Sequence, residues 1–487
     1  MKMRTSEEKV LNTFEGSNAV LDFLNPDNAP YTPLVEIPDH LNPYRKDGVR
    51  IFAKLMNALP LANVKSLPAY NMLLDQKEKG SLPDTLIENS SGNTILSLAV
   101  IARLMGVPHT KSICSHQVSK GKLNILRFLG TEVIINEEPI CPDPSDPTSG
   151  IYKAKVWSKE NGWFNPGQYG NEANPEAHYK WTGPQIWEQT NGKISLLSVG
   201  LGTTGSVVGM GKYLKEKNKN VEIVGISRVA NNPVPGVRTN NLLRQIAFDW
   251  KSILNFQEEV GTVESYKSSM DLCRAGLFVG PSSGFALVGL LNHLSKQKLS
   301  DEEKIAVFVC PDSPFPYIDE YFQYLDPSLF PKIENEHLLK EKVEHNVQSI
   351  PIIKELDSEE VFKLIFADNP DVVWDKIRSK SDVQIKKGFS IIDVRGEGEY
   401  EDHHIPQSIN VQYYEIDEFL KKNKKKLIKE EGVIFVCRHG NTSRLAAYKA
   451  DQLSIKSISL KGGDAEWSRL NLPRIRADKC IVRFDLQ

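Results

Sequence analysis

The sequence predicts an α/β fold arranged in two domains. Short β-branched or apolar runs alternate with helix-patterned segments from about residue 49 to residue 310, and a shorter alternation of the same kind follows residue 390. Alternation of strands and helices is typical of parallel sheets with helical crossovers. With 487 residues the chain is also too long for a single hydrophobic core.

The first block supplies most of the predicted elements. Its strands are expected at residues 131–135, 194–199, 221–226 and 305–309. Its helices are expected at residues 94–105, 120–129 and 210–215. Because the block is too long for one simple sheet, we expect two lobes with a ligand cleft between them.

A charged stretch separates the two blocks. Residues 331–349 carry few apolar positions and indicate a linker. We therefore expect a first domain over residues 1–335, a charged linker over 336–352 and a second α/β domain over 353–480. In the second domain, strands are expected at residues 390–394, 433–436 and 457–460.

Composition excludes several classes of partner. Sixty basic and sixty-two acidic residues nearly balance, so charge gives no reason to expect nucleic acid or an anionic membrane. The six cysteines are scattered without a CxxC pair, which argues against a disulfide framework or a structural zinc site, so no metal is expected. No signal peptide or membrane span is recognisable, and we expect a cytoplasmic protein.

Four segments of the first block suit a phosphate-bearing, amine-reactive cofactor. They are NVKSLPAYNML from residue 63, ENSSGNTILSLA from residue 88, VGLGTTGSVVGMGKYLKE from residue 199 and LFVGPSSGFALVGLL from residue 277. The second is a hydroxyl-rich turn before a helix, which favours a carboxylate. The third is a glycine-rich turn between a strand and a helix, which favours a phosphate, and it is neither a Walker loop nor a dinucleotide motif.

These segments, in this order and spacing, resemble the cysteine synthase and cystathionine β-synthase branch of the fold-type II pyridoxal-phosphate (PLP) enzymes. The resemblance implies a two-lobed, tryptophan synthase β-like domain that binds PLP. It makes Lys65 the residue whose amine attaches to the cofactor aldehyde. The chain departs from the family after this lysine, where Ser66, Leu67 and Pro68 replace the usual Asp-Arg, and at Ile95, where glycine is usual.

The resemblance also assigns the other site residues. Ser282 meets the pyridine nitrogen, and a neutral hydroxyl there favours loss of a β-substituent over prolonged carbanion chemistry. The cofactor contacts are Lys65, Asn93, Ser282 and the phosphate turn Gly202, Thr203, Thr204, Gly205 and Ser206. Among these, the resemblance assigns Asn93 to the oxygen of the cofactor ring. The contacts to the substrate carboxylate are Ser90, Ser91, Thr94 and, from the segment GQYGNEANPEAHYKWTGPQIWEQ, Gln168.

The second block resembles a single-domain rhodanese through FSIIDVRGEGEYEDHHIPQSINV, VIFVCRHGNTSRLAAYKADQL and SISLKGGDAEWSRLNLP. Cys437 ends an apolar strand and precedes a six-residue turn before a helix. The turn amides, the helix N-terminus and two nearby arginines (Arg438 and Arg444) are expected to lower the thiol pKa and stabilise a persulfide. The persulfide loop comprises Arg438, His439, Gly440, Asn441, Thr442 and Ser443.

A phosphatase is the rival interpretation of this cysteine loop. Its signature is Cys-x5-Arg, whereas six residues separate Cys437 from Arg444. The resemblance therefore favours sulfur transfer. Asp393, Arg395 and His404 are interpreted as structural rather than catalytic residues.

The leading hypothesis is a PLP-dependent β-replacement or β-elimination on a serine- or cysteine-like amino acid, coupled to persulfide transfer by Cys437. The expected partners are thus a small amino acid and a sulfur donor or acceptor, and a homodimer is left open. Alternatives are a cysteine desulfhydrase-type lyase, an enzyme using a nitrogen nucleophile, and a sulfur carrier with a degenerate PLP scaffold. Residues 227–245 are expected to shape the pocket without revealing the substrate.

Overall fold

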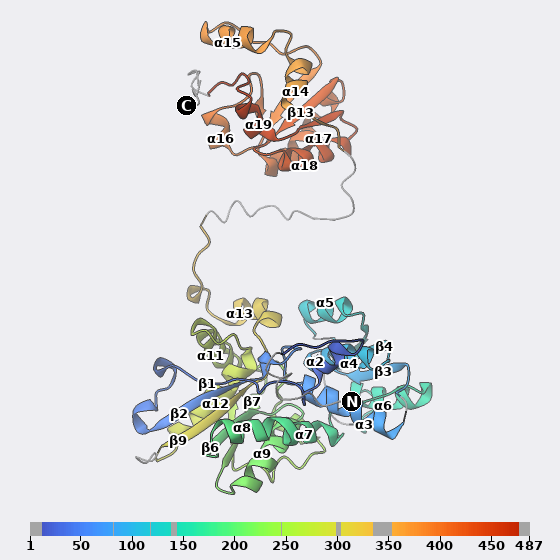
Figure 1. Cartoon of the computed structure of the whole chain (residues 1–487), viewed down its shortest axis with the longest axis vertical. Coiled ribbons are helices and arrows are strands. Elements are labelled where there is room, and N and C mark those ends of the chain that lie inside the picture. The colour runs from blue at the N-terminus through green and yellow to red at the C-terminus, as the bar shows by residue number, and fades with distance from the viewer. Residues whose placement is uncertain are drawn as a thin grey trace. The chain divides into compact units, whose positions relative to one another are not determined.

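The computed structural model describes residues 12–80, 82–116, 118–137, 144–244, 246–298, 303–334 and 353–476. The chain divides into two compact units, Met1–Pro331 and Lys332–Gln487 (Figure 1). The predicted linker over residues 336–352 lies outside the described residues, and the predicted domain limits remain predictions. Each unit is considered by itself below.

A six-stranded sheet forms the centre of the first unit. Its order is β1-β2-β9-β6-β7-β8, and all neighbours are parallel except β1 and β2. The strands are β1 (Leu34–Glu36), β2 (Val49–Leu55), β9 (Lys304–Cys310), β6 (Ile194–Gly200), β7 (Glu222–Arg228) and β8 (Phe256–Val260).

Helices cover both faces of this sheet, and β9 shows why. Its side chains alternate, with Ile305 and Val307 in one buried cluster and Ala306 and Phe308 in another. The first cluster includes residues of α3 and α9, and the second includes residues of α11 and α12. A parallel strand buried on both faces is continuously apolar, as the run IAVFV is. The four helices are α3 (Ser66–Lys79), α9 (Gly205–Lys217), α11 (Thr262–Arg274) and α12 (Pro281–Ser295).

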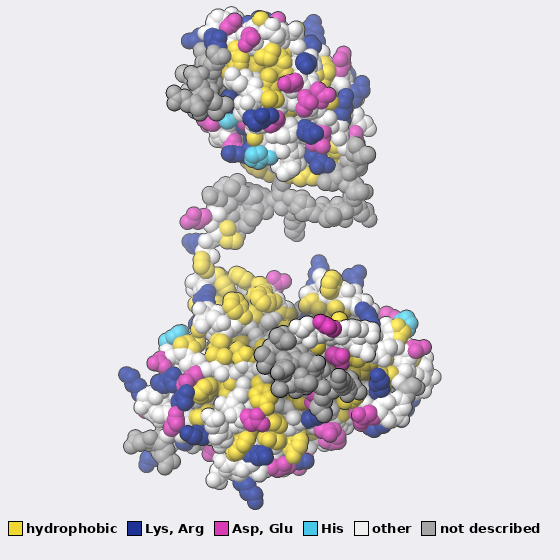
Figure 2. All heavy atoms as spheres, in the orientation of Figure 1, with side chains coloured by type: hydrophobic (Ala, Val, Ile, Leu, Met, Phe, Trp, Pro, Cys, Tyr) yellow, Lys and Arg dark blue, Asp and Glu magenta, His cyan; other side chains and the backbone are white. Residues whose placement is uncertain are grey.

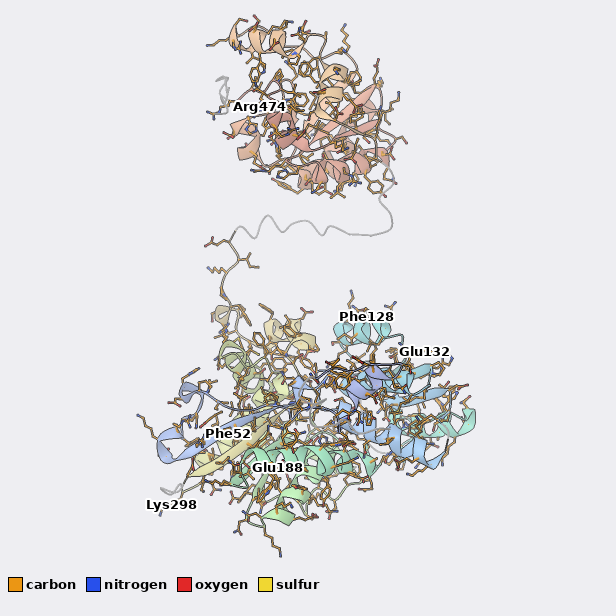
Figure 3. The ribbon with its side chains drawn as sticks, in the orientation of Figure 1. Phe52, Phe128, Glu132, Glu188, Lys298 and Arg474 are labelled. Carbon is orange, nitrogen blue, oxygen red and sulfur yellow. The ribbon has the colours of Figure 1, made fainter. Side chains whose placement is uncertain are left out.

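A second, three-stranded parallel sheet makes the other lobe of this unit. Its order is β3-β4-β5, formed by Thr85–Asn89, His109–Ser115 and Glu132–Asn136. Its helices are α4 (Asn93–Leu104), α5 (Lys120–Phe128) and α6 (Gly150–Asn161). Phe128, at the end of α5, points away from the lobe into solvent (Figure 3). The predicted two lobes are therefore present.

Shorter elements complete the first unit. The helices are α2 (Ala19–Leu24), α7 (Ala173–Ala177), the π-helical η4 (His178–Thr182), α8 (Gly183–Gln189), α10 (Asn240–Leu243) and α13 (Ile318–Tyr324). The 3-10 turns are η1 (Asp39–Leu41), η2 (Arg45–Asp47), η3 (Met56–Ala58), η5 (Phe315–Tyr317) and η6 (Pro327–Leu329).

The second unit contains a five-stranded parallel sheet of order β10-β14-β13-β11-β12. The strands are β10 (Glu355–Leu356), β14 (Ser457–Leu460), β13 (Gly432–Val436), β11 (Phe389–Asp393) and β12 (Ile409–Asn410). The helices are α14 (Ser358–Ile365), α15 (Pro370–Arg378), α16 (Glu397–Asp402), η8 (Tyr413–Glu415), α17 (Ile416–Leu427), α18 (Asn441–Asp451) and α19 (Gly463–Arg469).

The predicted strands agree with the structure to within one or two residues. The helix predicted at residues 210–215 is wrong in its start, because α9 begins at Gly205. Gly205 is the first residue of this helix, and Gly209 and Gly211 lie within it. No helix in the described ranges is both long enough and apolar enough to cross a bilayer. The described cysteines Cys114, Cys273, Cys310 and Cys437 are free thiols.

Candidate active sites

Lys65 lies at the start of α3 and reaches the glycine-rich turn. It is the N-cap residue of that helix, and its Nζ donates a hydrogen bond to Thr203 Oγ1 at 3.3 Å. Burial, aided by the positive charge of Arg238, lowers the pKa of Lys65 to about 8. A fraction of the amine is therefore uncharged near neutral pH, which is the form that reacts with an aldehyde.

The glycine-rich turn fits a phosphate group. It connects the end of β6 to the start of α9, as predicted. A Cβ at Gly202 would overlap Gly236 O, and one at Gly205 would overlap Asn174 Oδ1, so the backbone is too close to its neighbours for a side chain. Thr204 adopts a left-handed φ of 64°, and its buried Oγ1 has no hydrogen-bond partner in the described part of the chain. An unused hydroxyl and free helix amides are the donors that a phosphate needs.

Behind the turn, His178 contacts Ser206. Ser206 Oγ lies 3.2 Å from His178 Nε2, while His178 Nδ1 lies 3.0 Å from Thr182 Oγ1. Burial and the nearby charge of Lys65 lower the pKa of His178 to about 3. The ring is therefore neutral, and it orients the Ser206 hydroxyl without adding a charge. Sequence analysis did not select this histidine.

The hydroxyl-rich turn leads into α4 without capping it. Helix α4 has Gly92 as its N-cap and no side-chain capping bond. Ser90 Oγ accepts a hydrogen bond from Gly92 N at 3.4 Å, so neither Ser90 nor Ser91 caps the helix. Thr94 Oγ1 donates to Gln168 Oε1 at 2.7 Å, so the structure brings together these two predicted carboxylate contacts.

Glu88 and its neighbour Asn89 hold Gln168 and Gly167 by hydrogen bonds. Gln168 Nε2 donates to Asn89 O at 3.2 Å, and Gly167 N donates to Glu88 Oε2 at 2.8 Å. Burial raises the pKa of Glu88 to about 7 despite these bonds. The chain places an ionisable carboxyl directly behind the candidate substrate loop. In the sequence, the position of Glu88 in the run LIEN gave no indication that it lies behind this loop.

Two of the predicted ring contacts lie at helix starts on opposite lobes. Ser282 is buried in the first turn of α12. Asn93 is the first residue of α4, and its Nδ2 donates to Asp312 Oδ2 at 2.6 Å. Asp312 lies two residues after the end of β9.

Arg238 is a further residue that sequence analysis missed. It comes from the 227–245 segment, which was expected to shape the pocket. Its guanidinium is buried, donates to Tyr169 OH at 2.5 Å and lies 4.9 Å from the centre of that ring. Its charge is close enough to lower the pKa of Lys65. A second cationic side chain therefore lies close to Lys65.

In the second unit, Cys437 follows β13 and is 4% exposed. Gly440 N donates to Cys437 Sγ at 3.2 Å, and Ser443 Oγ lies 3.4 Å from the sulfur. Gly440 has a left-handed φ of 92°, which turns its amide toward the sulfur. The turn after Cys437 is shorter than the six residues predicted, because α18 begins at Asn441 and Asn441, Thr442 and Ser443 form its first turn.

The two neighbouring arginines do not turn to the sulfur as the sequence suggested. Arg438 pairs with Glu399 at 2.7 Å, and Arg444 Nε lies 3.6 Å from Glu355. Of the remaining loop residues, His439 and Asn441 are exposed and Thr442 is partly exposed. The bonding groups at Cys437 Sγ are thus the loop amide and hydroxyl.

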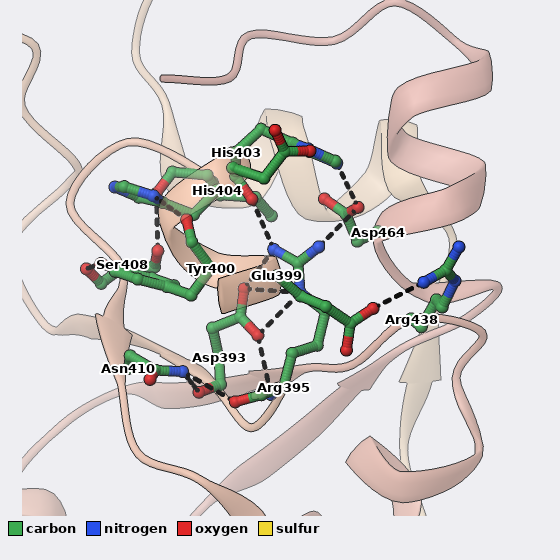
Figure 4. Close-up of polar contacts among 12 residues, drawn as sticks. Asp393, Arg395, Glu399, Tyr400, His403, His404, Ser408, Asn410, Arg438 and Asp464 are labelled. Carbon is green, nitrogen blue, oxygen red and sulfur yellow. Dashed lines mark hydrogen bonds and ion pairs between the residues drawn. The ribbon is translucent and has the colours of Figure 1, made fainter. Parts of the chain in front are cut away.

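A buried ionic network lies beside the cysteine loop (Figure 4). Arg395 bonds Asp393 at 2.7 Å and Asp464 at 2.8 Å. Asp464 also pairs with His403 Nε2 at 2.7 Å, and its backbone N donates to Cys437 O at 2.8 Å. The Asp464 bond raises the pKa of His403, with a smaller contribution from Asp402.

His404 and its neighbours have structural contacts. His404 Nδ1 lies 2.7 Å from Tyr400 O, and the two rings stack with centroids 3.9 Å apart. Burial lowers the pKa of His404. These contacts agree with the interpretation of Asp393, Arg395 and His404 as structural residues.

Comparisons with known proteins cover both units. Residues 27–311 match the family described as pyridoxal-phosphate dependent enzyme, and residues 369–470 match the rhodanese-like domain. Cysteine synthase B of Salmonella typhimurium is 31% identical over 264 residues, which are 53% of this chain and 84% of that protein. Cystathionine beta-synthase of Apis mellifera is 30% identical over 326 residues, 63% of each chain.

Solved structures show the same fold. The cysteine synthase of Entamoeba histolytica superposes with a TM-score of 0.55 at 22% identity, covering 70% of this chain and 99% of that one. A hydrogen sulfide-producing enzyme from Fusobacterium nucleatum gives 0.52 at 23% identity, covering 62% of this chain and all of the other. The chain belongs to the pyridoxal-phosphate dependent enzymes of the cysteine synthase type, and it carries a C-terminal rhodanese-like domain.

Proposed function

We propose that this chain catalyses β-replacement or β-elimination on a serine- or cysteine-like amino acid, and that Cys437 delivers sulfur to that reaction. The observation that supports the first half most directly is the contact of Lys65 Nζ with Thr203, at the turn whose glycines and free Thr204 hydroxyl suit a phosphate. PLP bound there would supply an aldehyde for amino groups and a ring that withdraws electrons from the substrate α-carbon.

The chain's own residues supply positioning and proton transfer. We propose that the Ser90 and Ser91 hydroxyls, with the Thr94–Gln168 pair, bind the substrate carboxylate and fix the amino acid over Lys65. Lys65, with its pKa lowered to about 8, can accept the α-proton on Nζ once its amine is released. Ser282, a neutral hydroxyl, would face the pyridine nitrogen.

The positive charge of Arg238 favours an anionic group near Lys65. A buried guanidinium that is paired with a tyrosine hydroxyl rather than a carboxylate retains its full positive charge. We propose that it faces either the leaving group of the substrate or an anionic sulfur nucleophile.

In the second unit, the Gly440 amide and the Ser443 hydroxyl suit a thiolate and a persulfide on Cys437. In the proposed step, the Cys437 thiolate attacks the outer sulfur of a persulfide donor. A bond forms between Cys437 Sγ and that sulfur, the donor's sulfur–sulfur bond breaks, and the electron pair leaves with the donor thiolate. A small thiol added as reductant then releases the sulfur: its thiolate bonds Cys437 Sγ in a mixed disulfide, and hydrosulfide leaves to attack the amino acid. A second thiol reduces the mixed disulfide and restores Cys437.

The test is an assay of the full-length chain with PLP, a serine ester or cysteine, and either free sulfide or a persulfide donor. Products to be measured are cysteine, sulfide, pyruvate and ammonia. Lys65→Ala should abolish all of them. Cys437→Ser should retain turnover with free sulfide and lose turnover with the persulfide donor, because only the second route uses the carrier.

Cys273→Ser is the matched control, because Cys273 is a partly buried thiol whose Sγ bonds Val279 O. It should behave as the unmodified chain with both sulfur sources. Full donor-dependent activity in Cys437→Ser would refute the coupling. Sulfide and pyruvate released from cysteine alone would identify the desulfhydrase alternative, and a colourless protein after PLP addition would identify the scaffold alternative.

We also propose a homodimer. Four exposed side chains, here called the α13 patch, lie on or next to α13 (Figure 2). They are Phe278, Phe315, Ile318 and Phe322, and the rings of Phe278 and Phe315 stack with centroids 6.3 Å apart. Such a cluster suits a protein interface. Sedimentation analysis of Phe315→Glu and Phe322→Glu variants should give a smaller species than the parent, and an unchanged mass would refute this assignment.

A further inference from the structure

Asp312 is a buried carboxylate at the end of β9 that bonds two side chains through one oxygen. It is 4% exposed. Its Oδ2 accepts a hydrogen bond from Asn93 Nδ2 at 2.6 Å and another from Tyr317 OH at 2.6 Å. Bonds this short are typical of an ionised acceptor. The carboxylate therefore holds the Asn93 amide firmly.

The backbone of Asp312 contacts two other parts of the candidate site. Asp312 pairs as an isolated antiparallel bridge with Asn63, two residues before Lys65. Its carbonyl accepts a bond from Gly280 N at 2.9 Å, two residues before Ser282. Asp312 thus contacts the three segments that carry the assigned cofactor residues Lys65, Asn93 and Ser282.

The second carboxylate oxygen lies against Gly280. A Cβ at Gly280 would overlap Asp312 Oδ1, so a side chain at residue 280 would displace the carboxylate. Oδ1 is buried and has no hydrogen-bond partner in the described part of the chain. A buried unsatisfied oxygen is costly, and such groups tend to persist at functional sites.

We propose that Asp312 is a positioning residue for the cofactor ring and acts through the Asn93 amide. The inference rests on the proposed assignment of Asn93 to the ring oxygen. A side-chain amide has one oxygen and two N–H donors. Because Asp312 Oδ2 accepts one N–H, the amide nitrogen must face the carboxylate, and the second N–H remains for a ring oxygen. The flipped amide would place its own oxygen against the carboxylate.

The groups around Asp312 act on its ionisation in opposite directions. Burial is the largest influence and raises the pKa of Asp312, while the hydrogen bonds from Tyr317 and Asn93, with the charge of Lys122, partly offset that rise. Lys122 comes from α5, and its Nζ lies 5.2 Å from the centre of the Tyr317 ring. The two donors and the nearby cation therefore favour the carboxylate over the protonated acid.

The test measures PLP binding to the full-length apo chain without any substrate. Asp312→Asn keeps the side-chain shape and removes the charge, so that the residue no longer dictates the amide orientation. We expect roughly tenfold weaker PLP binding, equivalent to about 1.4 kcal/mol, and a shifted visible absorption spectrum of the bound cofactor. Tyr317→Phe removes the other donor to the same oxygen and leaves Asn93 in place, so binding should change less than about threefold with an unshifted spectrum.

A double-mutant cycle shows whether the effect passes through Asn93. In an Asn93→Ala background, Asp312→Asn should change PLP affinity less than about twofold, because the amide it orients is gone. The inference is overturned if Asp312→Asn weakens binding equally in both backgrounds, if it changes neither affinity nor spectrum, or if Asn93→Ala alone leaves PLP binding intact.

Two controls complete this design. Circular dichroism of each apo variant establishes that it is folded, and Asp312→Ser, with a smaller side chain, carries the same expectations should the asparagine variant not fold. Because no amino acid or sulfur donor is present, failure of this inference is separate from failure of the proposed sulfur chemistry, which depends on the Cys437→Ser assay.

Discussion

Replacing Arg395 by leucine should strongly destabilise the second unit. The guanidinium bonds Asp393 and Asp464 at 2.7 and 2.8 Å, donates to His403 O at 2.7 Å and is 5% exposed. Removing one partner of a buried ionic group leaves uncompensated charge and typically costs about 3–5 kcal/mol. In Arg395→Leu, two buried carboxylates lose their common cation.

Amide hydrogen exchange of peptides from β11 and β13 measures this loss in the second unit alone. The opening free energy of these strands should fall by about 3–5 kcal/mol at neutral pH. Arg469→Leu is the control: Arg469 forms an exposed pair with Glu466 at 2.6 Å, and its loss should leave the opening free energy nearly unchanged.

A loss below about 1 kcal/mol in Arg395→Leu would refute this reasoning, because the network would then contribute no more than a surface pair.

Three further predictions concern single residues. Thr204→Val should weaken PLP binding roughly tenfold in an equilibrium titration, while the apo protein unfolds at an unchanged or higher temperature because a buried unpaired hydroxyl is removed. Asp464 raises the pKa of His403 in the folded chain, so their bond should stabilise the second unit fully below the unfolded pKa of about 6.5. This stabilisation should be lost as the pH rises through the folded pKa of His403. The free energies of unfolding in urea of His403→Gln and of the parent should therefore converge at alkaline pH. Arg238→Leu should raise the pKa of Lys65 in the apo chain, seen as a higher pH for half-maximal acylation of that amine by mass spectrometry, and a downward shift would contradict the charge effect.

Local patterns in the sequence predicted most of the frame. Runs such as IAVFV are apolar at every position because β9 is buried on both faces, and this signal is independent of distant residues. The Thr94–Gln168 bond joins residues 74 positions apart, and only the family resemblance brought them together before the structure did. The start of α9 was misplaced because the low helix propensity of glycine favoured a loop at Gly205. In the structure, the helix packs so closely against Asn174 that only glycine fits there.

The missed residues share a physical reason. Glu88, His178 and Arg238 owe their altered pKa values or their influence to burial and to charges that the chain brings close only on folding. In the sequence each lies within a segment of interest, but neither its neighbours nor the family resemblance assigns it a role. The same holds for Asp464, whose bonds to His403 and Arg395 span 61 and 69 positions.

The first unit takes its chemical groups from loops that continue β3, β6 and β9 beyond the sheets: the serine turn, the glycine turn and Asp312. The strands are held by backbone bonds to their neighbours, whatever side chains the loops carry. Substitutions in these loops can therefore change the groups presented there without removing a backbone bond between strands. The departures from the family pattern after Lys65 and at Ile95 are buried in the first turns of α3 and α4, so they alter the packing beside the loops rather than the loops themselves.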